Sequence, residues 1–307
     1  MSSPVHPVLH LSDLPGWSLP GTSLGLLGHP VAHSVSPAMH TAALAVLAAR
    51  EPGFATWHYD RFDVAPADLK STIALLHAKG FAGLNVTVPH KEAALALAES
   101  ADDFARAAGA ANTLVRTATG WHAANTDGPG LSAALLSELN TALRSRAVIL
   151  LGAGGAARAA AVQCLQERVS SLWIGNRGTG RLAALLLDLQ PHAGDIPLAG
   201  FALEQPPAHL PVNAIVINST SVGLHHECHG PIDLRRLPSP SAVFDMVYNP
   251  PDTALLRQAA ELGLPHAHGL SMLVAQGAHS LSRWTGRPVS TDAMHQAALL
   301  ALAYYSH

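Results

Sequence analysis

The chain has 307 residues, of which 49% are hydrophobic and 13% are charged, and its formal net charge is −3. This length favours two domains of ordinary size, and the composition is typical of a compact soluble enzyme rather than a disordered or fibrous chain. Because no basic run occurs, electrostatics disfavours a nucleic acid or an anionic membrane as partner, and a small molecule is favoured. The N-terminus lacks the pattern of a signal peptide and no apolar run is as long as a membrane span, so we expect a cytoplasmic protein.

Strand and helix patterns alternate from about residue 22 onward, which predicts an α/β fold with largely parallel sheets. In chain order we expect strands at 22–28, 55–64 and 83–88, helices at 36–50 and 65–80, and a short ribbon from 111–117 and 120–127. Ser36 is expected at the N-cap of the first helix with Pro37 at its first position, and Pro89 is expected to open a third helix. The first twenty or so residues, rich in Pro and Ser, are expected to form a loose extension.

The second half of the chain predicts a connecting helix and then a new run of strands. We expect a helix at 128–140, strands at 147–151, 171–176, 214–221 and 242–248, and helices only after Gly269. A break in the pattern near Asp127 therefore separates two α/β regions.

A glycine-rich turn with Gly152, Gly154 and Gly155 lies between the apolar run AVILL and a helical pattern, which is the context of a dinucleotide-binding turn. Backbone amides and the helix N-terminus there suit a pyrophosphate. NAD-binding proteins usually place an Asp or Glu at the end of the following strand, to hold the ribose 2′-hydroxyl. Here that strand ends in Asn176 and Arg177, with Arg181 close behind, and two guanidiniums suit a 2′-phosphate instead. The predicted cofactor is NADP.

Lys91 and Asp127 are the pair of residues with the chemistry of a proton donor and its carboxylate partner. Reduction of a ketone by hydride needs a proton for the developing alkoxide, and a lysine held near a carboxylate can supply it. Taken alone, the same two residues also fit a solvated lysine and a helix-capping turn.

The chain resembles the shikimate dehydrogenase family from about residue 22 to residue 286. The motifs that carry the resemblance are GHPVAHSVSPAMH, NVTVPHK, GAANT, NTDGPG, GAGGAARA, NRGTGR, NSTSVGL, DMVYNPPDTALL and GLSMLVAQGAHSLSRWTG. The resemblance implies reversible NADPH-dependent reduction of 3-dehydroshikimate to shikimate, in aromatic amino acid biosynthesis. It also implies a substrate-binding catalytic domain at 1–127 plus 270–307, to which the C-terminal helices return, and a doubly wound Rossmann-type NADP domain at 128–269.

The resemblance also implies roles for single residues. Ser34 and Ser36 would hold the substrate carboxylate, helped by Thr87 and Tyr248. The side chains that would face the ring hydroxyls, with Lys91 as acid and base, are Lys91, Asn112, Asp127 and Gln276. The cofactor would contact Asp103, Gly152, Ala153, Gly154, Gly155, Ala156, Asn176, Arg177, Arg181, Met246 and Gly269.

Histidines are numerous, but we expect no metal site. His29, His33 and His40 are interpreted as packing and hydrogen-bonding residues, because no carboxylate stands at a matching spacing. His225, His226, Glu227, Cys228 and His229 fall in what resembles a variable surface loop, and no second ligand set at zinc spacing accompanies them.

Four positions depart from the family pattern, namely Thr41, Gly178, Phe244 and Ser271. Gly178 stands where NADP-binding members commonly have Thr, so it bears on cofactor preference, although Thr179 could compensate. A quinate/shikimate dehydrogenase and an aminoshikimate-type relative remain alternatives within the enzyme class, and an NADP-binding sensor without activity is the alternative outside it. We expect a monomer or a homodimer.

Overall fold

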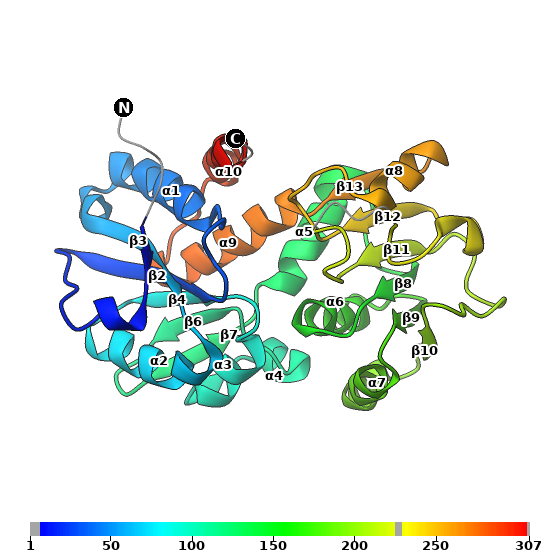
Figure 1. The fold of residues 1–307 in the computed structure, drawn as a ribbon, viewed down its shortest axis with the longest axis horizontal. Helices are drawn as coiled ribbons and strands as arrows, with labels where there is room; N and C mark the ends of the chain where they lie inside the picture. The colour runs from blue at the N-terminus through cyan, green and yellow to red at the C-terminus, as the bar shows by residue number, and fades with distance from the viewer. Residues whose placement is uncertain (1–6, 225–228, 306–307) are drawn as a thin grey trace. The chain divides into compact units, whose positions relative to one another are not determined.

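The computed structural model describes residues 7–224 and 229–305, and the chain divides into two compact units. Unit 1 runs up to Thr126 and resumes at Val274, and unit 2 is Asp127–Leu273. Each unit has a sheet of its own (Figure 1).

Unit 1 is built on a mixed sheet. Within the described residues this sheet has seven strands in the order β1-β3-β2-β4-β6-β7-β5. Its strands are β1 (Val8–Leu9), β2 (Thr22–Gly28), β3 (Trp57–Asp63), β4 (Gly83–Val86), β5 (Ser100–Ala101), β6 (Thr113–Arg116) and β7 (Trp121–Ala124). β1, β3, β2 and β4 run parallel, β6 pairs antiparallel with β4 and β7, and β5 pairs parallel with β7.

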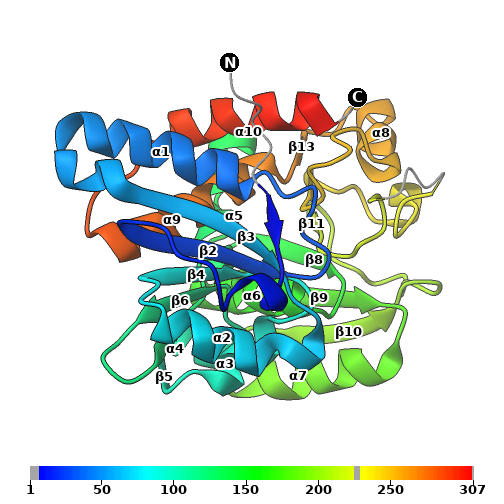
Figure 2. The same cartoon turned by 60° about the vertical axis from the view of Figure 1, so that its left-hand side comes forward.

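Helices cover both faces of this sheet. They are α1 (Ser36–Arg50), α2 (Leu69–Ala78), α3 (Lys91–Leu97), α4 (Asp103–Ala108), α10 (Thr291–Tyr305) and the part of α9 (Leu270–Thr285) from Val274 onward, with short 3-10 helices at Leu11–Asp13, Pro52–Thr56 and Pro66–Asp68. Figures 1 and 2 show α1 and α9 on one side of the sheet and α2, α3 and α4 on the other, and α10 packs against α1. The C-terminal helices thus return to the first unit, as expected.

The first twenty residues were expected to be loose, and for the described residues this prediction is wrong. β1 pairs with β3, Leu14 is fully buried, and the ring of Trp17 lies 5.0 Å from that of Phe81. Lys79 Nζ donates a hydrogen bond to the Trp17 carbonyl at 2.8 Å. The apolar residues of this segment cover one sheet face, and their burial outweighs a composition that favours loops.

The cap of α1 and the start of the third helix differ from the prediction. α1 covers the predicted range, but Val35 and not Ser36 is its N-cap and makes no side-chain capping bond, while Ser34 Oγ accepts from the Ser36 N–H at 3.3 Å. α3 begins at Lys91 rather than at Pro89, because a turn comes first, in which the His90 N–H donates to the Thr87 carbonyl.

Unit 2 contains a fully parallel sheet, with six strands among the described residues in the order β10-β9-β8-β11-β12-β13. Its strands are β8 (Ala147–Leu151), β9 (Ser171–Asn176), β10 (Leu198–Ala202), β11 (Ile215–Asn218), β12 (Ala242–Asp245) and β13 (His266–His268). Its helices are α5 (Asp127–Leu139), α6 (Gly155–Gln166), α7 (Thr179–Ala193), α8 (Ala254–Glu261) and a short 3-10 helix at Leu234–Arg236. This order, in sequence terms 3-2-1-4-5-6, is that of the doubly wound Rossmann fold, so the predicted fold class is confirmed.

The strands β11 and β12 end earlier than predicted, at Asn218 and Asp245. Polar residues follow each of them, and these leave the sheet as loops at the carboxyl ends of the strands. In an open parallel sheet, ligands bind at these ends, where the strand order reverses between β8 and β11.

Candidate active site

In unit 1, the loop that carries Ser34 follows β2 directly. We call residues 29–35 the serine loop. Gly28 permits its path, because a Cβ at Gly28 would lie 2.4 Å from Thr87 Cγ2 and 2.6 Å from Val31 Cγ1. The His29 N–H donates to the Val88 carbonyl at 3.0 Å. The serine loop and the Thr87 segment are therefore held side by side at the ends of β2 and β4.

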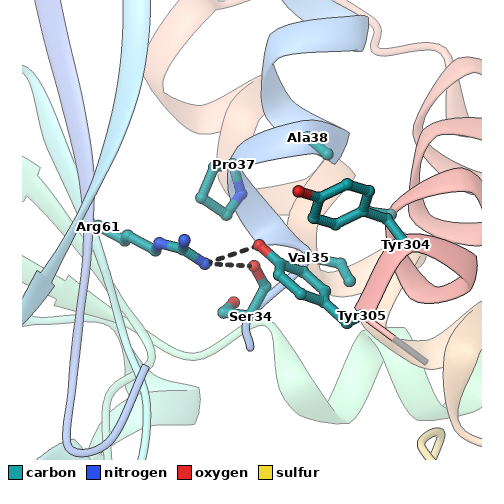
Figure 3. Close-up of a pocket in the computed structure, with 8 residues that line it drawn as sticks. Ser34, Val35, Pro37, Ala38, Arg61, Tyr304 and Tyr305 are labelled. Atoms are coloured by element: carbon teal, nitrogen blue, oxygen red, sulfur yellow. Dashed lines mark hydrogen bonds between the residues drawn. The ribbon is translucent and has the colours of Figure 1, made fainter. Parts of the chain in front are cut away.

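The predicted carboxylate-binding hydroxyls lie within this arrangement. Ser36 is buried at 7% exposure in the first turn of α1, while Ser34 and Thr87 are half-buried. Ser34 also lines a small pocket between α1 and α10 (Figure 3). Tyr248, the fourth residue predicted for the carboxylate, follows β12 in unit 2, and burial raises the pKa of its phenol.

Asn112 and Gln276 are in direct contact. Asn112 Nδ2 donates to Gln276 Oε1 at 3.1 Å, while Asn112 Oδ1 accepts from the Thr126 N–H at 2.8 Å. Because Oδ1 can only accept and Nδ2 can only donate, these bonds define the orientation of both side-chain amides. The structure thus brings together two of the residues predicted to face the substrate ring.

A buried hydroxyl network supports this amide pair. Ser280 Oγ lies 2.7 Å from Thr113 Oγ1 and 3.1 Å from Thr126 Oγ1, and it accepts from Asn85 Nδ2 at 3.0 Å. The Ser280 hydroxyl also contacts the Gln276 carbonyl one helical turn earlier in α9. Ser280, which is fully buried, was missed in the sequence, although its spacing of four from Gln276 places both on one helix face.

Lys91 is the first residue of α3 and is half-buried. Its carbonyl accepts from the Ala111 N–H at 2.9 Å, which fixes the start of α3 next to the segment that leads into Asn112. The neighbouring His90 is buried, its Nε2 donates to the Val64 carbonyl at 2.7 Å, and burial lowers its pKa. Lys91 is therefore placed on a well-anchored turn. Its predicted partner Asp127 is the first residue of α5 and is buried in unit 2.

In unit 2, the glycine turn after β8 has the features that a pyrophosphate requires. Gly152 has a φ of +116°, and a Cβ there would lie 2.7 Å from Ser219 Oγ. Gly154 precedes α6 and has open space where its Cβ would be, and Gly155 begins the helix. Ala153 and Ala156 flank these glycines, Ala153 buried and Ala156 half-buried. The open helix N-terminus lies at the switch in strand order.

Arg177 and Arg181 follow the neighbouring strand β9, whose Gly175 pairs with Leu151 at the end of β8. Both arginines are exposed. Asn176 Nδ2 donates to the Gly178 carbonyl at 2.9 Å, which shapes the turn before α7. Arg177 thus follows directly after β9, and Arg181 lies in the first turn of α7. Their binding of a 2′-phosphate stays a prediction.

Met246 and Gly269 lie close together at the ends of β12 and β13. A Cβ on Gly269 would lie 2.1 Å from the Met246 carbonyl oxygen, so only glycine permits this approach. Asp245, fully buried, accepts from Asn218 Nδ2, from Thr253 Oγ1 and from the Val247 N–H, and burial raises its pKa. This carboxyl, which sequence reasoning missed, holds the turn that carries Met246.

Asp103 lies apart from these groups, at the start of α4 in unit 1. Its side chain is 96% exposed and forms an ion pair with Arg106. Its predicted approach to the cofactor stays a prediction.

The histidines of the serine motif each make a separate contact. His29 Nδ1 bonds to Asp63 at 2.5 Å, the ring of His33 meets Tyr305 edge-on, and His40 stacks on Tyr59 with ring centroids 4.1 Å apart. His225, His226, Glu227 and Cys228 lie outside the described residues, and His229 is exposed. In the part of the chain that the structure describes, no group of three His, Cys, Asp or Glu side chains could hold a metal ion.

Among residues 7–224 and 229–305, no helix is long and apolar enough to cross a bilayer.

A Rossmann sheet with a glycine turn and two guanidiniums, together with an α/β unit rich in hydroxyl and amide donors, defines the class of two-domain, nucleotide-binding α/β proteins. Within this class, the family model described as the shikimate dehydrogenase substrate binding domain matches residues 26–114, and that of the shikimate 5′-dehydrogenase C-terminal domain matches residues 269–299. The shikimate dehydrogenase (NADP(+)) of Symbiobacterium thermophilum is 40% identical over 287 residues, which is 92% of this chain and 95% of the relative. The chain belongs to the shikimate dehydrogenase family, and the resemblance stated from its motifs is confirmed.

Solved structures agree with this assignment. The shikimate 5-dehydrogenase of Thermus thermophilus, in complex with NADP(H) and shikimate, superposes with a TM-score of 0.79 at 34% identity over 91% of this chain and 99% of its own. The quinate dehydrogenase of Corynebacterium glutamicum, in complex with NAD, superposes with a TM-score of 0.80 at 29% identity over 91% of this chain and 99% of its own.

Proposed function

We propose that the protein catalyses the reversible NADPH-dependent reduction of 3-dehydroshikimate to shikimate, in aromatic amino acid biosynthesis. The observation that carries the proposal is the donor-rich group in unit 1, in which Asn112 and Gln276 bond directly and Lys91 begins the adjoining helix. A ring with several hydroxyls needs such paired amides and a charged donor. Relatives that act on shikimate with NADP support the same reading.

In this proposal, different residues bind the two ends of the substrate. Ser34, Ser36 and Thr87 bind the carboxylate with hydroxyl donors, together with Tyr248. At the other end, Asn112, Gln276, Lys91 and Asp127 bind the ring oxygens. A site that forms a hydrogen bond with each ring hydroxyl is selective, because an analogue that lacks one hydroxyl leaves a buried polar group of the protein unpaired.

Lys91 donates the proton to the carbonyl oxygen during reduction and takes it back from the hydroxyl during oxidation. We propose that Asp127 is its carboxylate partner, which favours the charged ammonium. NADPH, when bound, supplies the hydride. Its pyrophosphate would be held by backbone amides at Gly152 to Ala156, and its 2′-phosphate by Asn176, Arg177 and Arg181, while Met246, Gly269 and Asp103 would contact the nicotinamide end.

The proposal assigns substrate binding and catalysis to residues 1–127 and 270–307, and NADP binding to residues 128–269. We further propose that the protein works in the cytoplasm as a monomer or a homodimer.

Quinate is the second candidate substrate, because the quinate dehydrogenase structure superposes as well as the shikimate dehydrogenase structure does. Steady-state kinetics with shikimate and quinate, each with NADP and with NAD, test both the substrate and the cofactor assignment. We expect the highest kcat/KM for shikimate with NADP. A higher value for quinate would reassign the substrate, equal activity with NAD would overturn the cofactor assignment, and NADP binding without turnover of either acid would indicate a sensor.

A further inference from the structure

A buried arginine of the unit 1 sheet donates hydrogen bonds to the serine loop. Arg61, in β3, is 2% exposed. Its Nη1 donates to the carbonyls of Ala32 at 2.5 Å and Ser34 at 3.4 Å. Because alternate residues of a strand share a face, Arg61 lies on the same side of the sheet as Tyr59, which packs against α1. The guanidinium therefore reaches the loop at the point where it enters α1.

The same guanidinium also binds the last turn of α10. Arg61 Nη1 donates to the hydroxyl of Tyr305 at 3.0 Å, and the ring of Tyr305 lies beside Ser34 and Val35 (Figure 3). One nitrogen of Arg61 thus links Ser34 to a residue 271 positions later in the chain, which sequence motifs do not reveal.

A second residue of β3 holds the beginning of the loop. Asp63, two residues beyond Arg61 at the end of β3, bonds to His29 Nδ1 at 2.5 Å and accepts from the Val31 N–H at 3.4 Å. The serine loop is therefore fixed to β3 at its beginning by a carboxylate and at its end by a guanidinium. The end is the part that presents the hydroxyls of Ser34 and Ser36.

We propose that Arg61 and Tyr305 are positioning residues for the carboxylate end of the substrate, acting through the serine loop. The inference rests on the proposed function, in which Ser34 and Ser36 bind that carboxylate. A loop released from Arg61 would bind the carboxylate less well in the ground state and in the transition state alike. Such uniform binding affects KM rather than kcat.

Tyr305→Phe is the principal test, because it removes one hydroxyl and leaves the ring in place. We expect the KM for shikimate to rise about 10-fold, in the range for loss of a hydrogen bond to a charged group, with kcat within about 2-fold and the KM for NADP unchanged. Tyr304→Phe is the matched control, since Tyr304 lines the same pocket but is 50% exposed, and we expect wild-type kinetics. Arg61→Lys keeps the charge but not the planar group of donors. Provided that this variant folds, it should raise the KM for shikimate more than Tyr305→Phe does.

A binding measurement separates positioning from a general loss of structure. Cyclohex-1-ene carboxylate, which has the acid but no ring hydroxyls, should inhibit Tyr305→Phe with a Ki about 10-fold higher than wild type, at equal melting temperature. A wild-type KM and Ki in Tyr305→Phe, whether or not the melting temperature falls, would overturn the inference. Failure of the proposed function looks different, because the wild-type protein itself would then not turn over shikimate.

Discussion

Asn112 donates its side-chain N–H to the side-chain Oε1 of Gln276 across 3.1 Å, and this bond joins the residue before β6 to the middle of α9. The direction follows from the other end of Asn112, whose Oδ1 accepts from the Thr126 N–H and from Thr113 Oγ1. Gln276 is then oriented with its amide nitrogen as the donor end, which suits an oxygen acceptor on the substrate.

Ser280→Ala tests the hydroxyl network that supports the pair of Asn112 and Gln276. The substitution removes a hydroxyl that contacts Thr113, Thr126 and the Gln276 carbonyl, so the amide pair loses its buried support. We expect kcat/KM for shikimate to fall about 10-fold, as for loss of one buried hydrogen bond of about 1.4 kcal/mol, with the Kd for NADP unchanged. Steady-state kinetics and calorimetric titration check this. Ser282→Ala, at a half-buried position two residues further along α9, serves as control, and an equal fall there would contradict the prediction.

Lys91→Ala tests the proton donor. Turnover of shikimate should fall by about 10²-fold or more, because the proposed proton donor would be missing from the transition state, while NADP binds with wild-type Kd. The exposed Lys70 on α2 provides a matched lysine, and Lys70→Ala should behave as wild type. Substantial turnover in Lys91→Ala, measured by NADPH absorbance, would remove Lys91 from the mechanism.

Arg177→Ala and Arg181→Ala test the 2′-phosphate site. Each should raise the KM for NADP about 10-fold, since each guanidinium is predicted to make a charge-assisted bond to the phosphate. Activity with NAD, which lacks that phosphate, should be unaffected. Arg235→Ala, another exposed arginine of unit 2, which pairs with Glu261, is the control for charge alone. An equal loss with both cofactors would show that the arginines act elsewhere.

The burial of His40 predicts that the free energy of unfolding depends on pH. Burial against Tyr59 and Trp284 lowers the pKa of His40 from 6.5 to about 3, and an interaction with Asn85 opposes this only in part. In the unfolded chain the histidine takes up a proton below pH 6.5, whereas the folded state does not. Stability therefore falls as the pH falls below 6.5, by about 2 kcal/mol at pH 5 from this group.

Urea unfolding at pH 7.5 and pH 5 measures this change in the free energy of unfolding. His40→Phe, which keeps a flat ring against Tyr59, should reduce the difference between the two pH values by about 2 kcal/mol. His266→Asn, at an exposed position, should leave the difference unchanged. A pH dependence that is the same in all three proteins would rule out His40 as its source.

The sequence predicted the elements with strong local signals. The strands Thr22–Gly28 and Ser171–Asn176 and the helix Ser36–Arg50 have the predicted bounds, because apolar periodicity and helix signals coincide there. The glycine turn was also placed correctly between β8 and α6, since its spacing is itself the structural requirement.

What the sequence did not reveal depends on contacts between distant segments. Burial of Leu14 needs the sheet face that it covers, and the role of Arg61 needs Tyr305 at the other end of the chain. Ser280 and Asp245 look like ordinary polar residues until the surrounding hydroxyls and amides are in place. Local sequence patterns carry no information about such distant partners. The sequence therefore revealed the motifs of the candidate site but not the residues that support them.

The segment before β2 has a practical consequence for anyone who prepares this protein. The substrate binding domain model begins its match at residue 26, inside β2 (Thr22–Gly28), which invites a shortened chain that starts at the first residue of β2. Such a chain would lose the leucine at position 14 and the indole at position 17, and would present bare aromatic surface from Phe62 and Phe81 to water. Poor solubility of a trimmed recombinant product would then reflect the missing cover and not a defect of the catalytic fold.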